Sequence, residues 1–149
     1  QQTGISVVQV TLHVVHGTFR PVRTRDIRDH QLGYEEYDLD PETAHAIERP
    51  KSEGRRVVAV GTTVVRTLES VAGEEGSLKS GRGKTDLLIT PGFRFKVVDA
   101  LITNFHMPRS SLLFLVSAFA GLELIRKAYQ TAIAKGYRFY SYGDAMLIL

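Results

Sequence analysis

Three short polar strings carry the residues of this sequence that are best suited to chemistry: Gly61-Thr62-Thr63, Thr103-Asn104-Phe105-His106 and Ser141-Tyr142-Gly143-Asp144. In the second string, an amide and an imidazole can orient a substrate and exchange a proton near neutral pH. In the first string, backbone and hydroxyl donors can hold a carboxylate, a phosphate or a ribose. Arg66 lies one helical turn after this string and extends its donor set. We therefore predict one polar site that gathers the three strings.

Each string also has a purely structural explanation. His106 can cap the helix that follows it, and Thr62 can cap its own helix while Arg66 pairs with Glu69. Tyr142 belongs to an aromatic stretch that suits core and rim packing as well as a ligand contact. Residue types alone leave these alternatives open.

The elements that would position the strings alternate between strand and helix. Alternating or continuous apolar residues predict strands over residues 8–14, 56–60, 87–89 and 99–102, and from about 137 to 149. Apolar residues at helical spacing predict helices over 41–49, 64–71, 110–120 and 122–133, with breaks at Pro50, Gly121 and Gly136. The stretches 22–40 and 73–85, which are charged or rich in glycine, are predicted to be irregular.

Strands that alternate with helices indicate an α/β fold with a mixed, partly parallel sheet and helices packed on it. In such sheets, ligands bind beyond the carboxyl ends of the strands, where loops and helix amino termini converge. We therefore expect the three polar strings to meet at that edge of the sheet.

The composition excludes several classes of protein. A chain of 149 residues with 43% apolar and 23% charged residues is typical of one globular domain. The absence of cysteine excludes disulfide frameworks and thiolate metal sites, and it favours a cytoplasmic location. The longest apolar stretch, residues 112–125, is shorter than the roughly 20 residues of a bilayer-spanning helix, so no membrane partner is expected.

The charge is distributed unevenly along the chain. Residues 1–75 carry 9 basic and 12 acidic side chains, whereas residues 76–149 carry 10 basic and 4 acidic ones. A basic surface gains affinity for a polyanion such as RNA by releasing counterions. Arg94 and Lys96 flank Phe95, a pattern that suits nucleic acid, although a solvated charged loop is the commoner explanation.

Several longer strings resemble the S-adenosylmethionine:tRNA ribosyltransferase-isomerases of queuosine biosynthesis over almost the whole chain. These strings are residues 11–14 (TLHV), 17–22 (GTFRPV), 58–63 (VAVGTT), 65–70 (VRTLES), 91–106 (PGFRFKVVDALITNFH), 115–121 (LVSAFAG) and 137–146 (YRFYSYGDAM). The chain is similar to the carboxyl-terminal half of that family. The resemblance implies that residues 1–149 are the carboxyl-terminal part of an α/β catalytic domain, without the amino-terminal half that includes a small β-barrel domain.

The resemblance also implies an activity. The family transfers and isomerises the ribosyl group of S-adenosylmethionine onto 7-aminomethyl-7-deazaguanine at the tRNA wobble position, which gives epoxyqueuosine. S-adenosylmethionine is then a substrate, and no cofactor or metal is expected. The expected partners are the tRNA anticodon region, S-adenosylmethionine and the missing amino-terminal half, without which this part is expected to be inactive. A diverged tRNA-binding relative without catalysis is the alternative.

Carried over to this chain, the family mechanism needs a base and hydrogen-bond donors. His106 is the leading acid or base candidate, Asn104 would orient the sugar, and Asp99 and His13 are further catalytic candidates. The expected substrate-binding residues are Thr62, Thr63, Arg66, Arg94, Lys96, Tyr142, Asp144 and Glu35.

The chain departs from the family pattern at a few positions. Gly33 and Tyr34 stand where the family usually has histidine and serine, and only Glu35 of that run is kept. Val64 replaces a usual serine, His16 replaces a usual small or apolar residue, and Pro50 interrupts a usual helix. If positions 33 and 34 belong to the site, a substrate contact is lost.

Overall fold

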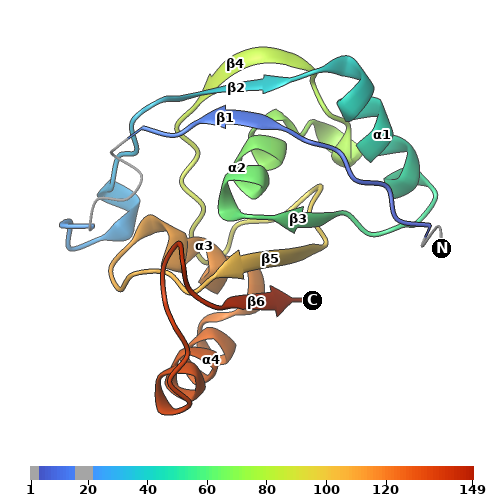
Figure 1. Cartoon of the computed structure of the whole chain (residues 1–149). Helices are drawn as coiled ribbons and strands as arrows, with labels where there is room; N and C mark the ends of the chain where they lie inside the picture. The colour runs from blue at the N-terminus through green and yellow to red at the C-terminus, as the bar shows by residue number, and fades with distance from the viewer. Residues whose placement is uncertain (1–3, 16–21) are drawn as a thin grey trace.

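Two small sheets with helices around and between them form the core of the fold, which the computed structural model describes for residues 4–15 and 22–149 (Figure 1). The strands are β1 (Thr11–His13), β2 (Glu35–Leu39), β3 (Val58–Val60), β4 (Gly81–Thr85), β5 (Ala100–Asn104) and β6 (Ala145–Ile148). The helices are α1 (Pro41–Ser52), α2 (Thr62–Val71), α3 (Ser111–Ala120) and α4 (Leu122–Ala134), with 3₁₀ turns at Ile27–Asp29 and Glu74–Gly76. The string at residues 17–21 and His16 lie outside the described residues.

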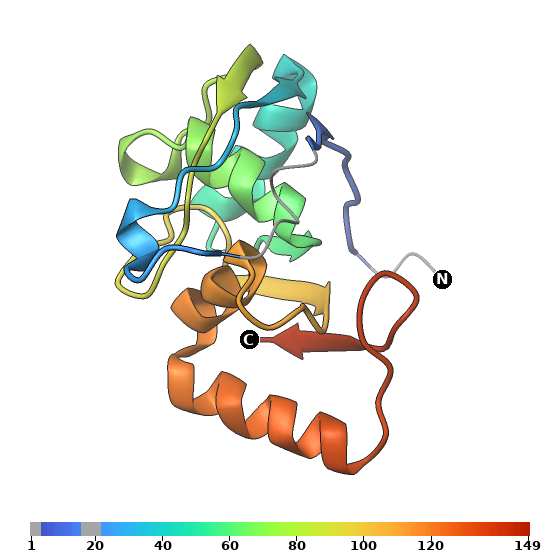
Figure 2. The same cartoon turned by 90° about the vertical axis from the view of Figure 1, so that its left-hand side faces the viewer.

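The strand order confirms an α/β fold with a partly parallel sheet. One sheet has the order β1-β2-β4 and is antiparallel throughout. In the other, of order β3-β5-β6, β5 runs parallel to β3 and antiparallel to β6. Helix α2 follows β3 and contacts strands of both sheets, and α4 lies beyond β6 on the side away from α1 (Figures 1 and 2).

The core lies on both sides of α2. Its side chains Val65, Leu68 and Val71 are buried with Ala59 and Leu101 of the mixed sheet. Because α2 packs between two sheets, even its polar residues Thr67 and Glu69 are buried. The position of the Gly61-Thr62-Thr63 turn is therefore fixed by the packing of the helix that follows it.

Helix α1 begins where the sequence predicts but ends later. Asp40 caps it, because its Oδ1 accepts the Thr43 backbone N–H at 2.8 Å, and Pro41 occupies the first turn. The predicted end near residue 49 is wrong, since the helix continues to Ser52 with Pro50 inside it. Pro50 lies in the last turn, where its missing N–H removes one hydrogen bond, and two more helical residues follow it.

The stretches predicted to be irregular contain two paired strands, so that prediction is wrong for β2 and β4. Glu36 lies opposite Lys84 and Asp38 opposite Arg82, with ion pairs of 3.2 Å and 2.8 Å. These strands are held by cross-strand charge pairs instead of an apolar alternation. A side chain at position 83 would require the Tyr37 ring to move, because a Cβ atom would lie 2.3 Å from the Tyr37 hydroxyl oxygen.

Other strand boundaries also differ from the sequence prediction, while the later helices agree with it. The strand expected over 8–14 is reduced to β1, residues 87–89 are not a strand, and the strand expected from 137 begins only at β6. Residues 137–144 instead form turns that precede β6. Helix α3 starts after Ser110, and Gly121 and Gly136 adopt positive φ at the predicted breaks.

Within the described residues, no helix has the length and apolar character needed to cross a membrane.

Candidate functional site

A cavity of about 320 Å³ lies where the carboxyl end of β5, the start of α2 and the start of α3 meet. Fourteen described residues line it: Val14, Gly61, Thr62, Thr63, Arg66, Thr103, Asn104, Phe105, His106, Met107, Ser110, Leu112, Tyr140 and Ser141. The first two polar strings enter it completely, and the third contributes only Ser141. The cavity thus brings the first two strings together at the carboxyl edge of the mixed sheet, whereas most of the third string lies outside its lining.

The turn from β3 into α2 presents helix amides to this cavity. Gly61 has a φ of 95° and donates its N–H to Ile102 O on β5 at 2.8 Å, which ties the turn to the neighbouring strand. Within the described part of the chain, no side chain caps the amino terminus of α2, so Thr62 is not the side-chain cap that the structural alternative requires. The first turn of α2 therefore keeps its amide donors toward the site, where the helix dipole favours negative charge.

Arg66 lines the same cavity and is held from behind by Glu35. Its Nη1 pairs with a Glu35 carboxylate oxygen, and its Nε donates to Leu87 O at 3.1 Å. The two side chains are 4% and 0% exposed. The alternative pairing of Arg66 with Glu69 is wrong, because Glu69 accepts backbone N–H groups of residues 96–98 instead.

His106 lies at the end of β5 with a neutral imidazole. Its Nε2 is 3.1 Å from Thr103 Oγ1, and its backbone N–H donates to the Tyr129 hydroxyl oxygen at 2.7 Å. Burial lowers the pKa of His106 to about 4, because the charged imidazolium would lose hydration. The cap of α3 is Ser110, whose Oγ accepts the Leu113 N–H at 3.2 Å, so the helix-cap explanation for His106 is wrong.

Asn104 joins β5 to the turn that carries the third string. Its Nδ2 donates to Gly143 O at 3.3 Å and to Asp144 O at 3.4 Å. Gly143 admits no side chain, because a Cβ atom would lie 2.5 Å from Arg138 O. The Asn104 side chain therefore fixes the turn beside the cavity as well as lining the cavity itself.

Tyr140 is the aromatic residue that this turn places at the cavity. It adopts a φ of 69°, which is unusual for a residue other than glycine, and its N–H donates to Phe105 O at 2.9 Å. The side chain is 51% exposed although Phe105 beneath the turn is buried. A half-exposed ring on a fixed backbone can stack on a planar ligand.

Comparisons with known proteins agree with this geometry. A sequence model of the family described as queuosine biosynthesis protein matches residues 1–148. The chain belongs to the queuosine biosynthesis protein family. It is 56% identical over 149 residues to the S-adenosylmethionine:tRNA ribosyltransferase-isomerases of Desulfitobacterium hafniense and Moorella thermoacetica, covering 100% of this chain and 44% of each relative. The chain thus spans less than half the length of these curated relatives.

A solved structure shares the family fold. The crystal structure of S-adenosylmethionine tRNA ribosyltransferase from Thermotoga maritima is similar to this chain with a TM-score of 0.72 and 53% sequence identity. The match covers 77% of this chain and 40% of that one. The fold described above is therefore the family's fold over most of the chain.

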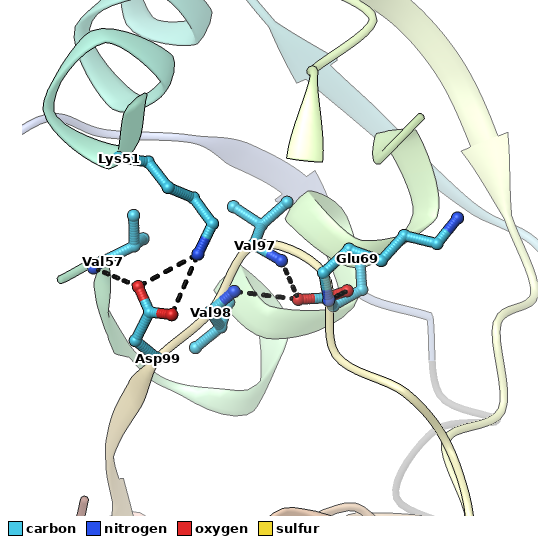
Figure 3. Close-up of polar contacts among 7 residues, drawn as sticks. Lys51, Val57, Glu69, Val97, Val98 and Asp99 are labelled. Carbon is cyan, nitrogen blue, oxygen red and sulfur yellow. Dashed lines mark hydrogen bonds and ion pairs between the residues drawn. The ribbon is translucent and has the colours of Figure 1, made fainter. Parts of the chain in front are cut away.

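In this member of the queuosine biosynthesis family, Asp99 lies away from the cavity. It precedes β5 and so lies at the opposite end of that strand from Asn104. Its carboxylate accepts the Val57 N–H at 2.8 Å and pairs with Lys51 Nζ at 2.9 Å (Figure 3). The expectation that Asp99 is catalytic therefore does not fit its position, and its contacts hold α1 and the start of β3 together.

Asp99→Asn in the full-length protein should leave kcat within roughly threefold of the parent and lower the free energy of unfolding by roughly 1 to 2 kcal/mol. The asparagine oxygen can still accept from Val57, but the ion pair with Lys51 is lost. Asp86→Asn, at an exposed position, is the control. Urea unfolding and steady-state kinetics give both quantities. A hundredfold loss of kcat with unchanged stability would instead place Asp99 in the reaction.

Several other predicted site residues also lie outside the lining. His13 is exposed on β1, and the next residue, Val14, reaches the cavity in its place. Glu35 lies behind Arg66, so it positions the arginine instead of touching a ligand directly. Arg94 and Lys96 are exposed and do not line the cavity.

Tyr142 and Asp144 of the third string were predicted to bind substrate, but they lie outside the cavity lining. Tyr142 is 96% exposed, and Asp144 accepts the Arg138 N–H at 2.7 Å. That hydrogen bond lowers the pKa of Asp144, which is an exposed structural carboxylate of the turn. Neither residue lines the cavity.

Among the residues that the structure describes, the positions at which this chain departs from the family pattern do not line the cavity. Gly33 and Tyr34 are exposed just before β2, and Val64 lies in α2 without reaching the cavity wall. The substitutions at these positions therefore remove no cavity-lining residue.

The apolar part of the lining was missed by sequence reasoning. It comprises Val14, Phe105, Met107, Leu112 and the ring of Tyr140. Phe105 lies within a predicted string and Met107 follows it directly, so position in the chain could have identified both. Val14 comes from the other sheet, and no local pattern indicates that it reaches this cavity.

Among the described residues, no three histidine, aspartate or glutamate side chains gather in a way that would hold a metal ion.

Proposed function

We propose that the full-length protein transfers and isomerises the ribosyl group of S-adenosylmethionine onto 7-aminomethyl-7-deazaguanine at the wobble position of tRNA. The relatives that are 56% identical to this chain are named S-adenosylmethionine:tRNA ribosyltransferase-isomerases. The single observation that carries the proposal is the cavity in which the donors of α2 face the polar end of β5. It lies at the strand edge where α/β folds bind nucleotides and related ligands.

The chain supplies only part of the enzyme in this proposal. Residues 1–149 form the carboxyl-terminal part of the catalytic domain, and the remaining length of the relatives supplies the amino-terminal half. The enzyme acts in the cytoplasm on the anticodon region of tRNA, and it uses S-adenosylmethionine as a substrate without a further cofactor. The excess of basic over acidic side chains in residues 76–149 supports contact with RNA phosphates.

The chemistry assigned to the cavity is proton transfer and charge stabilisation. The sulfonium of S-adenosylmethionine acidifies the adjacent ribose carbon, and a base removes a proton there. Adenine and methionine both leave as the sugar rearranges and bonds to the aminomethyl nitrogen, which gives up a proton. His106 is neutral at physiological pH, so it enters the reaction as a proton acceptor, and Thr103 beside it orients the ring. Asn104 orients the sugar, and the donors of Thr62 and Thr63 hold polar groups of the substrate.

The proposal is tested with the full-length protein, S-adenosylmethionine and a tRNA that carries the precursor base. Liquid chromatography and mass spectrometry should detect free adenine and epoxyqueuosine in equal amounts. The same tRNA with unmodified guanine at the wobble position is the control and should give neither product. If the precursor tRNA binds but gives neither product, the chain belongs to a tRNA-binding relative without catalysis.

Tyr140 is assigned to stack on the adenine of S-adenosylmethionine. Tyr140→Ala should raise the Kd for S-adenosylmethionine by roughly 5- to 100-fold, the range expected when one aromatic stacking contact with a base is removed. Tyr140→Phe should keep the affinity of the parent, because the ring is retained. Tyr142→Ala is the matched control, since Tyr142 is 96% exposed and lies outside the cavity lining. Isothermal titration calorimetry gives these affinities, and equal losses at positions 140 and 142 would contradict the assignment.

A further inference from the structure

We propose that Arg66, held by Glu35, binds the α-carboxylate of the amino-acid arm of S-adenosylmethionine together with the first turn of α2. The inference rests on the proposed function. It adds that the cavity wall formed by Arg66 and the start of α2 recognises the carboxylate of the substrate. Three observations carry it: the unfinished hydrogen bonding of Arg66, the charge of the cavity lining and the burial of the guanidinium.

The guanidinium of Arg66 is fixed on two of its three nitrogens. Nη1 pairs with Glu35, and Nε donates to Leu87 O at 3.1 Å. Nη2 is buried and has no hydrogen-bond partner among the residues that the structure describes. Buried guanidinium N–H groups are normally satisfied, because an unsatisfied donor loses its hydration without compensation. Since Arg66 also lines the cavity, a ligand oxygen in the cavity is the partner that would complete its hydrogen bonding.

Glu35 fixes the orientation of the guanidinium in advance. Its own side chain is fully buried, and its other oxygen accepts the Val15 N–H at 3.3 Å. The pair spans 31 positions of sequence, from β2 to α2, so it is set by the fold before any ligand enters. An arginine fixed in this way loses little side-chain freedom when it binds an anion.

The remaining lining favours an anionic group near Arg66. Thr62 and Thr63 lie one turn before Arg66, on the helix end where free amides and the dipole attract negative charge. No aspartate or glutamate is present among the described residues of the lining. A carboxylate can accept from Nη2 and from this helix end at the same time.

A small-molecule carboxylate fits this position better than a phosphate of tRNA. Arg66 is 3% exposed, so its nitrogen is reached from inside the cavity and not from the protein surface where an RNA backbone would lie. The methionine arm of S-adenosylmethionine ends in a carboxylate on a flexible chain, which can reach a donor inside the cavity.

The test compares S-adenosylmethionine with its decarboxylated analogue on the full-length protein and on Arg66→Lys. Calorimetry should show that the parent binds the analogue roughly 10- to 100-fold more weakly, the size of a lost charge-assisted hydrogen bond. Arg66→Lys keeps a cation beside Glu35 but lacks the planar fork, and its preference for the carboxylate should fall below about threefold. Its Kd for tRNA should match that of the parent.

The outcomes separate this inference from the proposed function. Equal affinity of the parent for both compounds, with normal turnover of S-adenosylmethionine, would overturn the inference and leave the function intact. Absence of turnover with a clear preference for the carboxylate would support the inference and overturn the function. A loss in Arg66→Lys of tRNA affinity alone would overturn the inference in favour of a phosphate contact. If Arg66→Lys does not fold, the comparison of the two compounds on the parent still decides.

Discussion

Replacing His106 with alanine in the full-length protein is expected to lower kcat by roughly 10²- to 10⁴-fold, the usual loss when a general acid or base is removed. The side chain lines the cavity at the end of β5, and Thr103 contacts its Nε2 at 3.1 Å. The fold should survive, because the contact from position 106 to Tyr129 is made by the backbone N–H. Steady-state adenine release measures kcat, and circular dichroism checks the fold.

His13→Ala is the matched control for that experiment. His13 is also a histidine that follows an apolar strand residue, but it is exposed and lies outside the cavity lining. We expect its kcat to stay within roughly twofold of the parent. Equal losses at positions 13 and 106 would show that neither effect reports the cavity, and full activity of His106→Ala would remove His106 from the mechanism.

The pH dependence of kcat/KM should show that the His106 imidazole stays neutral to a lower pH than an exposed imidazole would. The pKa of His106 is lowered to about 4 because burial disfavours its charged form. The free enzyme therefore keeps the neutral, proton-accepting form down to about pH 5, and the acid limb due to this group lies near pH 4 instead of near 6.5. An acid limb near pH 6.5 that disappears in His106→Ala would contradict the burial of the ring.

Stability should respond to the same pKa difference. The folded pKa of His106 lies below its value in the unfolded chain, so the unfolded chain takes up a proton first as the pH falls. The contribution of His106 is therefore fully present above about pH 6.5 and is lost as the pH falls toward about 4. When the pH is lowered from 7 to 5, the free energy of unfolding, measured with urea, should fall less for His106→Ala than for the parent.

The part of the fold that could be predicted from the sequence is the part built from apolar periodicity. The strand, turn and helix around Gly61 and the two helices separated by Gly121 follow local patterns, and the structure has them at these positions. Strands β2 and β4 could not be found in this way. Their pairing depends on charges that face one another across 44 to 48 positions of sequence, such as Asp38 with Arg82.

The site shows the same division between local and long-range information. That Thr62 and His106 share a cavity follows from the rule for strand ends in α/β sheets. The partner of Arg66 does not follow from sequence spacing, because Glu69 is the nearer acid on the helix whereas Glu35 is the actual partner. The position of Asp99 at the opposite end of β5 from the cavity, by contrast, was already implied by the strand predicted over residues 99–102, and only the resemblance made it a catalytic candidate.

The ion pair behind the cavity should be the most sensitive single contact for stability. Glu35→Ala leaves the buried Arg66 guanidinium without its carboxylate, a change that typically destabilises a protein by about 3 to 5 kcal/mol. It also removes the acceptor for the Val15 N–H, next to Val14 of the lining. Glu35→Gln should lose less, because its oxygen can still accept a hydrogen bond from Arg66.

Glu36→Ala provides the matched control on the adjacent residue of β2. Glu36 pairs with Lys84 at 3.2 Å, but both side chains are more than half exposed, so losing this pair should change stability by less than about 1 kcal/mol. Urea unfolding of the full-length variants, at one pH and ionic strength, gives both values. Because water screens the outer pair but not the inner one, added salt should reduce the small effect at position 36 and leave the large effect at position 35. Similar losses at the two positions would mean that the Arg66 guanidinium finds another partner, and the cavity wall would then not depend on Glu35.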